Sequence, residues 1–192
     1  MIMITQSLKT KILFILLAIM GCTSCSTEYP SPITWSECGG EIENHACDFT
    51  LVNQTGDDWN LYDHYGSIIV LDFSAVWCGY CQIAASKAQE IQDKFPGQDV
   101  VWVTILLQNA YGQTPSVTDL QKWSQEFDIT TSPVLAGNNT IIDSSGENGY
   151  NPSSWPAIVI IDRDLVITYK LHGWNEMQIN MWLEEMTSQT IE

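Results

Sequence analysis

The sequence has few basic residues. Seven lysines and arginines stand against 23 aspartates and glutamates, which gives a formal net charge of −16. Proteins that bind nucleic acid need a basic surface to hold the phosphates. This composition therefore excludes a nucleic-acid-binding protein. The acidic residues are scattered along the chain and predict no site of their own.

Groups of metal-ligating residues are also missing. The chain has three histidines, no second C-x-x-C pair and no two histidines close in sequence. A structural zinc ion needs four ligands, usually cysteine and histidine, so the cysteines do not form such a site. His45 beside Cys47 offers a loop with three candidate ligands, which is a weak metal site. We expect no metal and no organic cofactor.

A long apolar run is absent as well. Residues 12–20 are apolar, but they are fewer than the about 20 residues that a helix needs to cross a bilayer. Lys9 and Lys11 precede the run and Gly21-Cys22 follows it, which resembles a bacterial lipoprotein signal. We expect residues 1–21 to be removed and Cys22 to be acylated, with ordinary secretion as the alternative.

The predicted signal places the protein in a bacterial cell envelope, facing the periplasm, where disulfides persist. Thr23 follows Cys22 in place of the aspartate that would retain such a lipoprotein in the inner membrane, so we expect the outer membrane. Residues 22–46 are predicted to hold a flexible tether, rich in Ser, Thr and Pro, and a loop between Cys38 and Cys47. Residues 47–192 are long enough for one domain.

The six cysteines fall into groups. Cys38 and Cys47 lie nine residues apart across a Gly-Gly turn and could close a small structural loop. Cys78 and Cys81 form a C-x-x-C pair. Cys25 has no evident partner, and the sequence leaves open whether it is a free thiol, a second lipid site or an intermolecular link.

The C-x-x-C pair lies where a strand passes into a helix. An apolar run at 67–74 predicts a buried strand before it, and apolar residues recur every three or four positions after it. Cys78 would then occupy the first turn of the helix, where free backbone amides and the helix dipole favour an anion. Cys81 begins the inward stripe. We therefore expect an exposed, activated Cys78 thiol with a shielded Cys81 thiol behind it.

Other periodic segments complete the predicted architecture. Apolar runs predict strands at 48–52, 100–107, 157–161 and 165–170. Capping-box spacing from Ser116 to Asp119 predicts the start of one helix, and a last helix begins near Asn175. Residues 128–154 are polar and rich in Gly, Asn and Ser, which indicates a surface loop with a short strand or turn at 133–135. The order is βαβ, helix, β-hairpin, helix.

Three motifs carry a family resemblance, which covers about residues 47–186. They are Phe49-Thr50-Leu51 with its turn, the segment from Val70 to Cys81, and Trp155-Pro156-Ala157 before a strand. With these motifs the chain resembles the thioredoxin superfamily, and within it the exported, membrane-tethered proteins related to the AhpC/TSA group. The resemblance implies an α/β fold, a three-layer α/β/α sandwich with a central mixed sheet and an N-terminal extension.

The resemblance also implies roles for individual residues. Pro156 would be cis and face the disulfide beside Cys78, and Trp155 would present its backbone to an extended substrate. Asp72 corresponds to the buried acid that accepts a proton from the resolving cysteine. We expect a raised pKa for this carboxyl because it lies on a buried strand.

The residues within and before the C-x-x-C pair would contact the substrate. Trp77 would shield the pair, and Gly79 and Tyr80 are the two middle residues that set the redox potential. Tyr80 stands where thioredoxin has a proline, so we expect a potential intermediate in the range of about −270 to −120 mV known for this fold.

The predicted function is thiol–disulfide exchange with envelope proteins, by a monomer that a membrane redox partner regenerates. Cys78, Cys81, Asp72 and Pro156 would be its catalytic residues. One alternative is a peroxiredoxin-type peroxidase, which would need a single cysteine in a Thr-x-x-Cys loop. Another is a copper chaperone that adds His172 to the cysteine pair. The client protein and the direction of electron flow stay open.

Overall fold

The computed structural model describes residues 37–138, 140–142 and 149–188. The predicted signal at residues 1–21, the predicted acylation site Cys22 and the unassigned Cys25 lie outside the described residues. The described part belongs to the compact unit Ile33–Glu192. None of its helices is both long enough and apolar enough to cross a membrane.

A five-stranded mixed sheet lies at the centre, in the order β5-β4-β3-β6-β7. Strands β3, β4 and β5 run parallel, and β6 and β7 run antiparallel to their neighbours. β3 is buried along its whole length because it lies in the middle of the sheet. The strands are β3 (Ile68–Ala75), β4 (Val100–Gln108), β5 (Val134–Ala136), β6 (Ala157–Ile161) and β7 (Ile167–His172).

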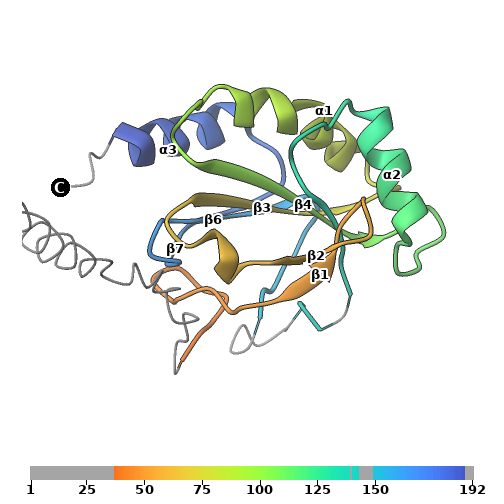
Figure 1. Ribbon diagram of the computed structural model, residues 1–192, viewed down its shortest axis with the longest axis horizontal. Coiled ribbons are helices and arrows are strands. Elements are labelled where there is room, and N and C mark those ends of the chain that lie inside the picture. The colour runs from red at the N-terminus through yellow and green to blue at the C-terminus, as the bar shows by residue number, and fades with distance from the viewer. Residues whose placement is uncertain (1–36, 139, 143–148, 189–192) are drawn as a thin grey trace, which may run out of the picture. The chain divides into compact units, whose positions relative to one another are not determined.

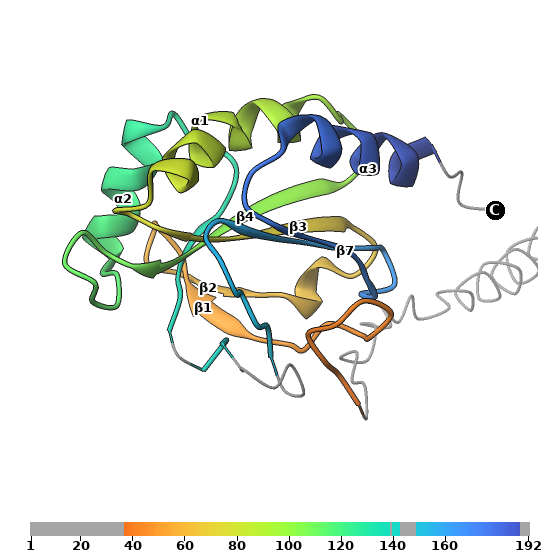
Figure 2. The same ribbon diagram turned by 180° about the vertical axis from the view of Figure 1, so that it is seen from behind.

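Two layers cover the sheet. Helices α1 (Gly79–Asp93) and α3 (Glu176–Ser188) lie along one face, with α2 (Val117–Glu126) near its β5 end (Figure 1). The opposite side holds the hairpin of β1 (Thr50–Val52) and β2 (Asp58–Asn60), as both ribbon views show (Figure 2). The predicted thioredoxin-like α/β fold with a mixed sheet is confirmed, although hairpin and loop segments form much of its second outer layer.

Two apolar clusters correspond to the two faces of the sheet. Successive residues of a strand point to opposite faces. Val70 therefore joins the cluster under α1 and α3, while Leu71 joins the other cluster. The helix-side cluster contains both Cys78 and Cys81. The second cluster contains Leu51, Trp59 and other residues of the hairpin layer.

Helix α2 begins as its sequence predicts. The backbone amide and the hydroxyl of Ser116 each donate to the Asp119 carboxylate, at 2.8 and 2.7 Å, and the amide of Asp119 donates to the Ser116 hydroxyl oxygen at 3.3 Å. This reciprocal capping box satisfies free amides of the first turn. It also fixes where the loop after β4 must end.

Several short elements were not predicted. Strand β2 and the 3-10 helix η1 (Tyr62–His64) lie between the predicted strands at 48–52 and 67–74, where the apolar pattern predicts no element. Strand β1 begins two residues later than predicted and β7 ends two residues later. Tyr150 lies in the predicted surface loop but is buried, with 1% of its surface exposed. Short elements carry too little periodicity to be recognised, and the burial of Tyr150 depends on non-local contacts with Phe49 and Phe73.

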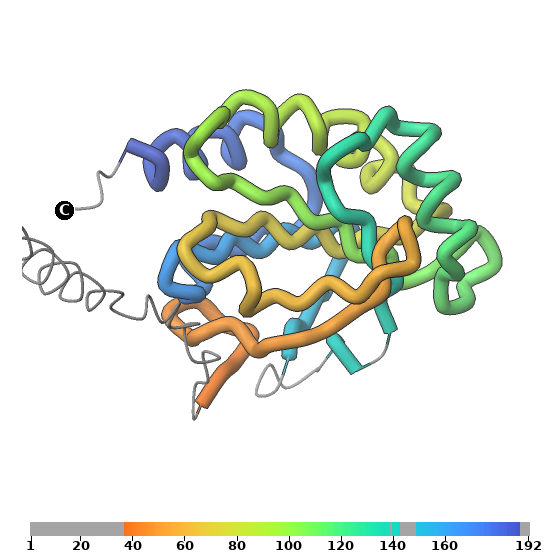
Figure 3. The backbone as a smooth tube through the Cα atoms, in the orientation of Figure 1, coloured from red at the N-terminus to blue at the C-terminus, as the bar shows by residue number. Residues whose placement is uncertain are grey.

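Residues 37–47 pack against the end of the sheet formed by β7, where the orange and blue parts of the tube lie side by side (Figure 3). The amides of Glu43 and Ala46 donate to carbonyls of Ile167 and Leu165, and the amide of Ile167 donates to the Asn44 carbonyl. A disulfide joins Cys38 to Cys47 within this loop. We refer to residues 38–47 as the staple loop.

Candidate active site

Cys78 is the N-cap residue of α1. Its backbone is extended, with φ −87° and ψ 113°, and its Sγ accepts a hydrogen bond from the Cys81 amide at 3.2 Å. The helix starts here because the strand ends at Ala75 and the apolar stripe begins at Cys81. A free amide and the helix dipole therefore point at the Cys78 sulfur, and both stabilise a thiolate there.

Cys78 and Cys81 are joined by a disulfide, with their Cα atoms 5.2 Å apart. Cys78 keeps 8% of its surface exposed and Cys81 none. The inner position of Cys81 agrees with its place on the stripe. Cys78 is more covered than the open position that the sequence indicated, because Val76 and Trp155 pack against the same cluster. An attacking sulfur therefore reaches Cys78 only over the small part of its surface that remains exposed.

Asp72 lies fully buried on β3, opposite Thr104 of β4 and Ile158 of β6. It lies two residues after Val70 on the strand and so points to the same sheet face, which carries α1 and the cysteine pair. Burial raises the pKa of the Asp72 carboxyl to about 7, against the opposing effect of the Ser74 and Thr104 hydroxyls. A carboxyl with this pKa can accept and release a proton near neutral pH.

The loop before β6 lies beside the start of α1. The Trp155–Pro156 peptide bond is cis, and Ala157 pairs with Phe73 of β3, so Pro156 lies at the end of the sheet where β3 leads to Cys78. The indole rings of Trp77 and Trp155 pack at a tilt of 40°, with their centroids 5.3 Å apart. Trp155 is thus held next to the residue that precedes Cys78.

The two middle residues of the pair face solvent. Gly79 has no neighbouring atom within 4 Å of the position where a Cβ would lie, and 69% of the Tyr80 side chain is exposed. Trp77 is 56% exposed, and its Nε1 donates to Oε1 of Gln108 at 3.0 Å. These side chains surround the opening to Cys78 and are available to a partner.

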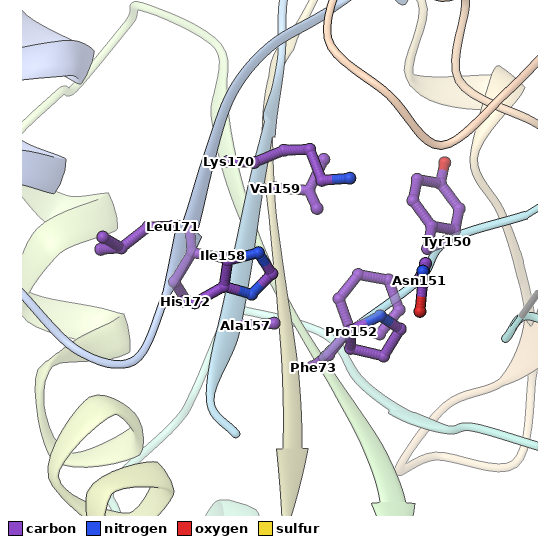
Figure 4. A pocket seen from close by; sticks show the side chains of 10 residues that line it. All are labelled: Phe73, Tyr150, Asn151, Pro152, Ala157, Ile158, Val159, Lys170, Leu171 and His172. Carbon is purple, nitrogen blue, oxygen red and sulfur yellow. The ribbon is translucent and has the colours of Figure 1, made fainter. Parts of the chain in front are cut away.

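His172 does not join this group. It ends β7 opposite Ala157, and its Nδ1 lies 3.1 Å from the hydroxyl of Ser153. Together with Lys170 it lines a small hollow on the side of the sheet that holds Tyr150, whereas Leu171 points the other way (Figure 4). Within the described ranges no three His, Cys, Asp or Glu side chains come together as metal ligands could.

Two contacts of the site were not anticipated from the sequence. The Ser74 hydroxyl donates to Oδ1 of Asp72 at 2.7 Å, and Gln108 holds the Trp77 indole. Ser74 could have been found, because it lies two residues after Asp72 on a strand and must share its face. Gln108 carries no such signal, since its contact depends on the pairing of β4 with β3.

Comparison with known proteins places the chain among redox proteins of this fold. The AhpC/TSA family model matches residues 42–170. The thioredoxin-like protein YneN of Bacillus subtilis is 26% identical over 132 residues, which are 68% of this chain and 71% of that protein. The thiol-disulfide oxidoreductase ResA of Geobacillus kaustophilus is 25% identical over 157 residues, 82% of this chain and 81% of that protein.

A solved structure adds to these relatives. The exposed lipoprotein thioredoxin of Streptococcus pneumoniae is 26% identical, with a TM-score of 0.53, and the match covers 72% of this chain and 99% of that one. The family model spans more than half of the chain, including β3, the C-x-x-C pair and β6. The chain therefore belongs to the AhpC/TSA family of the thioredoxin superfamily and is a thioredoxin-like oxidoreductase.

Proposed function

We propose that the protein exchanges disulfides with proteins of the bacterial cell envelope through Cys78 and Cys81. The observation that carries this proposal is the position of the Cys78 sulfur at the N-cap of α1, with the covered Cys81 bonded to it. This arrangement gives one sulfur that is stabilised as a thiolate and can be reached, and a second sulfur within bonding distance.

In the reducing direction, the Cys78 thiolate attacks one sulfur of a client disulfide. A Cys78–client disulfide forms, and the client sulfur that leaves takes up a proton. The Cys81 thiolate then attacks the Cys78 sulfur, which forms the Cys78–Cys81 disulfide and releases the second client thiol. The client gains two electrons and the protein loses two. Oxidation of a client dithiol follows the same steps in reverse.

Asp72 would accept the Cys81 proton before the second attack. It lies on the same face of the sheet as Cys81, and its pKa of about 7 suits transfer at neutral pH. Pro156 and Trp155 would align the client chain, and Trp77, Gly79 and Tyr80 would contact it. These roles agree with the exposure of Trp77 and Tyr80 beside the opening.

A peroxiredoxin-type peroxidase would act through a single attacking cysteine. Here the corresponding sulfur is bonded to Cys81, and the pair occupies the strand–helix junction. A copper chaperone would use His172 together with the pair, but His172 lies on the other side of the sheet. Exchange chemistry therefore fits the geometry better than either alternative.

The place of action would be the periplasmic side of the envelope, with the protein anchored as a monomer to the outer membrane through acylated Cys22. The signal-like residues 1–21 support this, as does the likeness to an exposed lipoprotein thioredoxin of Streptococcus pneumoniae. A membrane redox protein would reduce the Cys78–Cys81 disulfide again after each cycle, because reduction of a client converts the dithiol into this disulfide.

Insulin reduction and refolding of scrambled ribonuclease test the proposal. Full-length protein without its signal should catalyse at least one of them, and Cys78→Ala should abolish both activities because the attacking sulfur is gone. Cys38→Ala paired with Cys47→Ala removes the other disulfide and serves as the matched control. A Cys78→Ala protein with full activity in both assays would refute the mechanism.

A further inference from the structure

The segments that surround the disulfide carry no charged residue. The ends of β3, β4 and β7 and the start of β6 meet at one edge of the sheet, because Ala75 pairs with Gln108, Phe73 with Ala157 and Ala157 with His172. The stretches of sequence that contain this edge lack Lys, Arg, Asp and Glu throughout; they are 73–86, 100–118, 149–161 and 171–175. Because the chain has a net charge of −16, a surface without charged side chains differs from the rest of the molecule.

Aromatic side chains take the place of charges on this edge. Trp77 and Tyr80 are 56% and 69% exposed, and Trp155 is half-buried against Trp77. Asp119 follows one of the uncharged stretches, but its carboxylate is occupied in capping α2. A partner that meets this surface would find aromatic rings and backbone groups and no salt-bridge partner.

The most exposed of these rings belongs to Tyr111, at 87%. It lies in the loop directly after Gln108, the residue that holds the Trp77 indole. In the described part of the chain, its hydroxyl has no hydrogen-bond partner and its ring no ring contact. A large aromatic side chain in water gains free energy when a partner covers it.

The loop that carries Tyr111 is tightly held. Oδ1 of Asn109 accepts hydrogen bonds from the amides of Tyr111 and Gln113 at 2.9 and 3.0 Å, and the Asn109 amide donates to the Gln113 carbonyl at 2.8 Å. Gly112 completes the turn with φ +74°, a conformation that favours glycine. An exposed ring on a loop ordered in advance costs less entropy to bind than a ring on a flexible one.

Because the ordered loop that carries Tyr111 follows directly on Gln108, which holds the Trp77 indole, we infer that Tyr111 and Trp77 form a binding surface for an extended polypeptide that carries an uncharged, aromatic residue next to its disulfide cysteine. This inference depends on the proposed exchange function and specifies its substrate class. The client residue stacks on Tyr111 while the client sulfur meets Cys78. Small charged disulfides without a ring, such as oxidised glutathione, gain nothing from this surface.

Matched peptides test the inference. Two capped peptides differ only in the residue beside their disulfide cysteine, which is tyrosine in one and serine in the other. The wild-type protein should reduce the tyrosine peptide with a kcat/KM about tenfold higher, the gain of one buried aromatic anchor. Its rate on either peptide should not change with ionic strength, because no charges meet in the complex.

The variant Tyr111→Ala should lower the ratio of the two kcat/KM values to about one, and Tyr111→Phe should keep most of it. Tyr65→Ala is the matched control. Tyr65 is 49% exposed and precedes β3, whereas the cysteine pair follows β3, so it lies at the far edge of the sheet. This variant should keep the ratio of the wild type.

The outcomes separate the two proposals. A wild-type protein that reduces both peptides equally fast, or a Tyr111→Ala variant that keeps the full ratio, overturns the binding surface and leaves the exchange function standing. A wild-type protein that reduces neither peptide nor oxidised glutathione overturns the exchange function itself. Both kcat/KM values of a variant are measured on the same protein sample. Partial loss of folded protein lowers both values equally and leaves their ratio unchanged.

Discussion

The described part of the protein holds two disulfides, which are chemically the same bond in different surroundings. Cys38 and Cys47 lie in the staple loop, whose shape is fixed by backbone hydrogen bonds to Ile167 and Leu165 of the β7 hairpin. Cys78 and Cys81 lie at the mouth of α1, where an amide points at the Cys78 sulfur. The bond in the staple loop is not the more covered of the two, because Cys38 is half-buried and Cys47 is 5% exposed, against 8% for Cys78 and none for Cys81.

Exposure alone therefore does not distinguish the two bonds. What differs is the stability of the state that follows when each bond opens. An opened Cys78–Cys81 pair finds a helix N-terminus that stabilises a thiolate and a buried acid, Asp72, whose pKa of about 7 suits the proposed proton transfer. An opened Cys38–Cys47 pair remains in place through its backbone contacts, so the bond easily re-forms. The first bond suits exchange and the second suits a permanent staple.

The largest expected effect comes from removing the attacking sulfur. Cys78→Ser should lower the exchange rate by more than about a thousandfold, because hydroxyl oxygen is a far weaker nucleophile than a thiolate. Insulin reduction measures this. Cys81→Ser should instead trap a mixed disulfide with the client, visible on a non-reducing gel. Equal activity of wild type and Cys78→Ser would show that Cys78 is not the attacking sulfur.

The staple can be removed separately. Replacing Cys38 and Cys47 together by serine should lower the free energy of unfolding by about 3 kcal/mol, as expected when a loop of this length loses its cross-link. Urea unfolding measures the change. The exchange rate of the folded variant should stay within about twofold of the wild type, since the staple does not enter the reaction. A large loss of rate at full stability would show that the two disulfides are coupled.

A smaller effect is expected at the proton acceptor. Asp72→Asn should slow the release of the mixed disulfide by about tenfold at neutral pH, because no carboxylate is left to deprotonate Cys81. Stopped-flow fluorescence can follow this step, since Trp77 lies directly before Cys78. The pH dependence around 7 seen in the wild type should disappear in the variant. A variant with the same rate and the same pH profile contradicts the role of Asp72.

Although Asp72→Asn should slow exchange, it should stabilise the folded protein at high pH. Its folded pKa of about 7 lies above the value of an exposed aspartate, so the folded protein holds a proton that the unfolded chain has lost. The contribution of Asp72 to stability is thus fully present below the unfolded pKa and is lost as pH rises through about 7. Asp72→Asn should gain stability relative to the wild type above that pH. Thermal unfolding across pH values measures the difference.

The smallest effect concerns Ser74. Ser74→Ala removes a hydrogen bond that favours the ionised Asp72, so the pKa of Asp72 should rise further, by about half a unit. The pH profile of mixed-disulfide release should shift upward by the same amount. Ser74→Thr keeps a hydroxyl and should restore the wild-type profile. A profile that is unchanged in Ser74→Ala would show that this hydrogen bond does not tune the acid.

The central elements of the fold could be predicted from local pattern. The buried run of β3, the apolar stripe of α1 and the Ser116 capping box each combine a strong period with a clear boundary. The same holds for the cysteine pair, since its place between strand and helix is visible in sequence. These parts involve contacts that a single segment determines by itself.

Other parts depend on contacts between distant segments and could not be seen. The burial of Tyr150 requires Phe49 and Phe73 from two strands, and its hydroxyl donates to the Cys47 carbonyl at 3.2 Å. The pairing of the staple loop with Ile167 has no local signal. Tyr111 was overlooked because an exposed aromatic residue in a loop becomes informative only when that loop is known to follow Gln108, which holds the Trp77 indole.

One redox titration tests the comparison most directly. The protein is equilibrated in buffers of graded potential, its free thiols are alkylated, and each cysteine pair is read by mass spectrometry in the same sample. We predict that Cys78–Cys81 is half reduced between about −270 and −120 mV, while Cys38–Cys47 stays oxidised down to about −300 mV or lower. Reduction of Cys38–Cys47 at the same or a higher potential than Cys78–Cys81 would contradict the account.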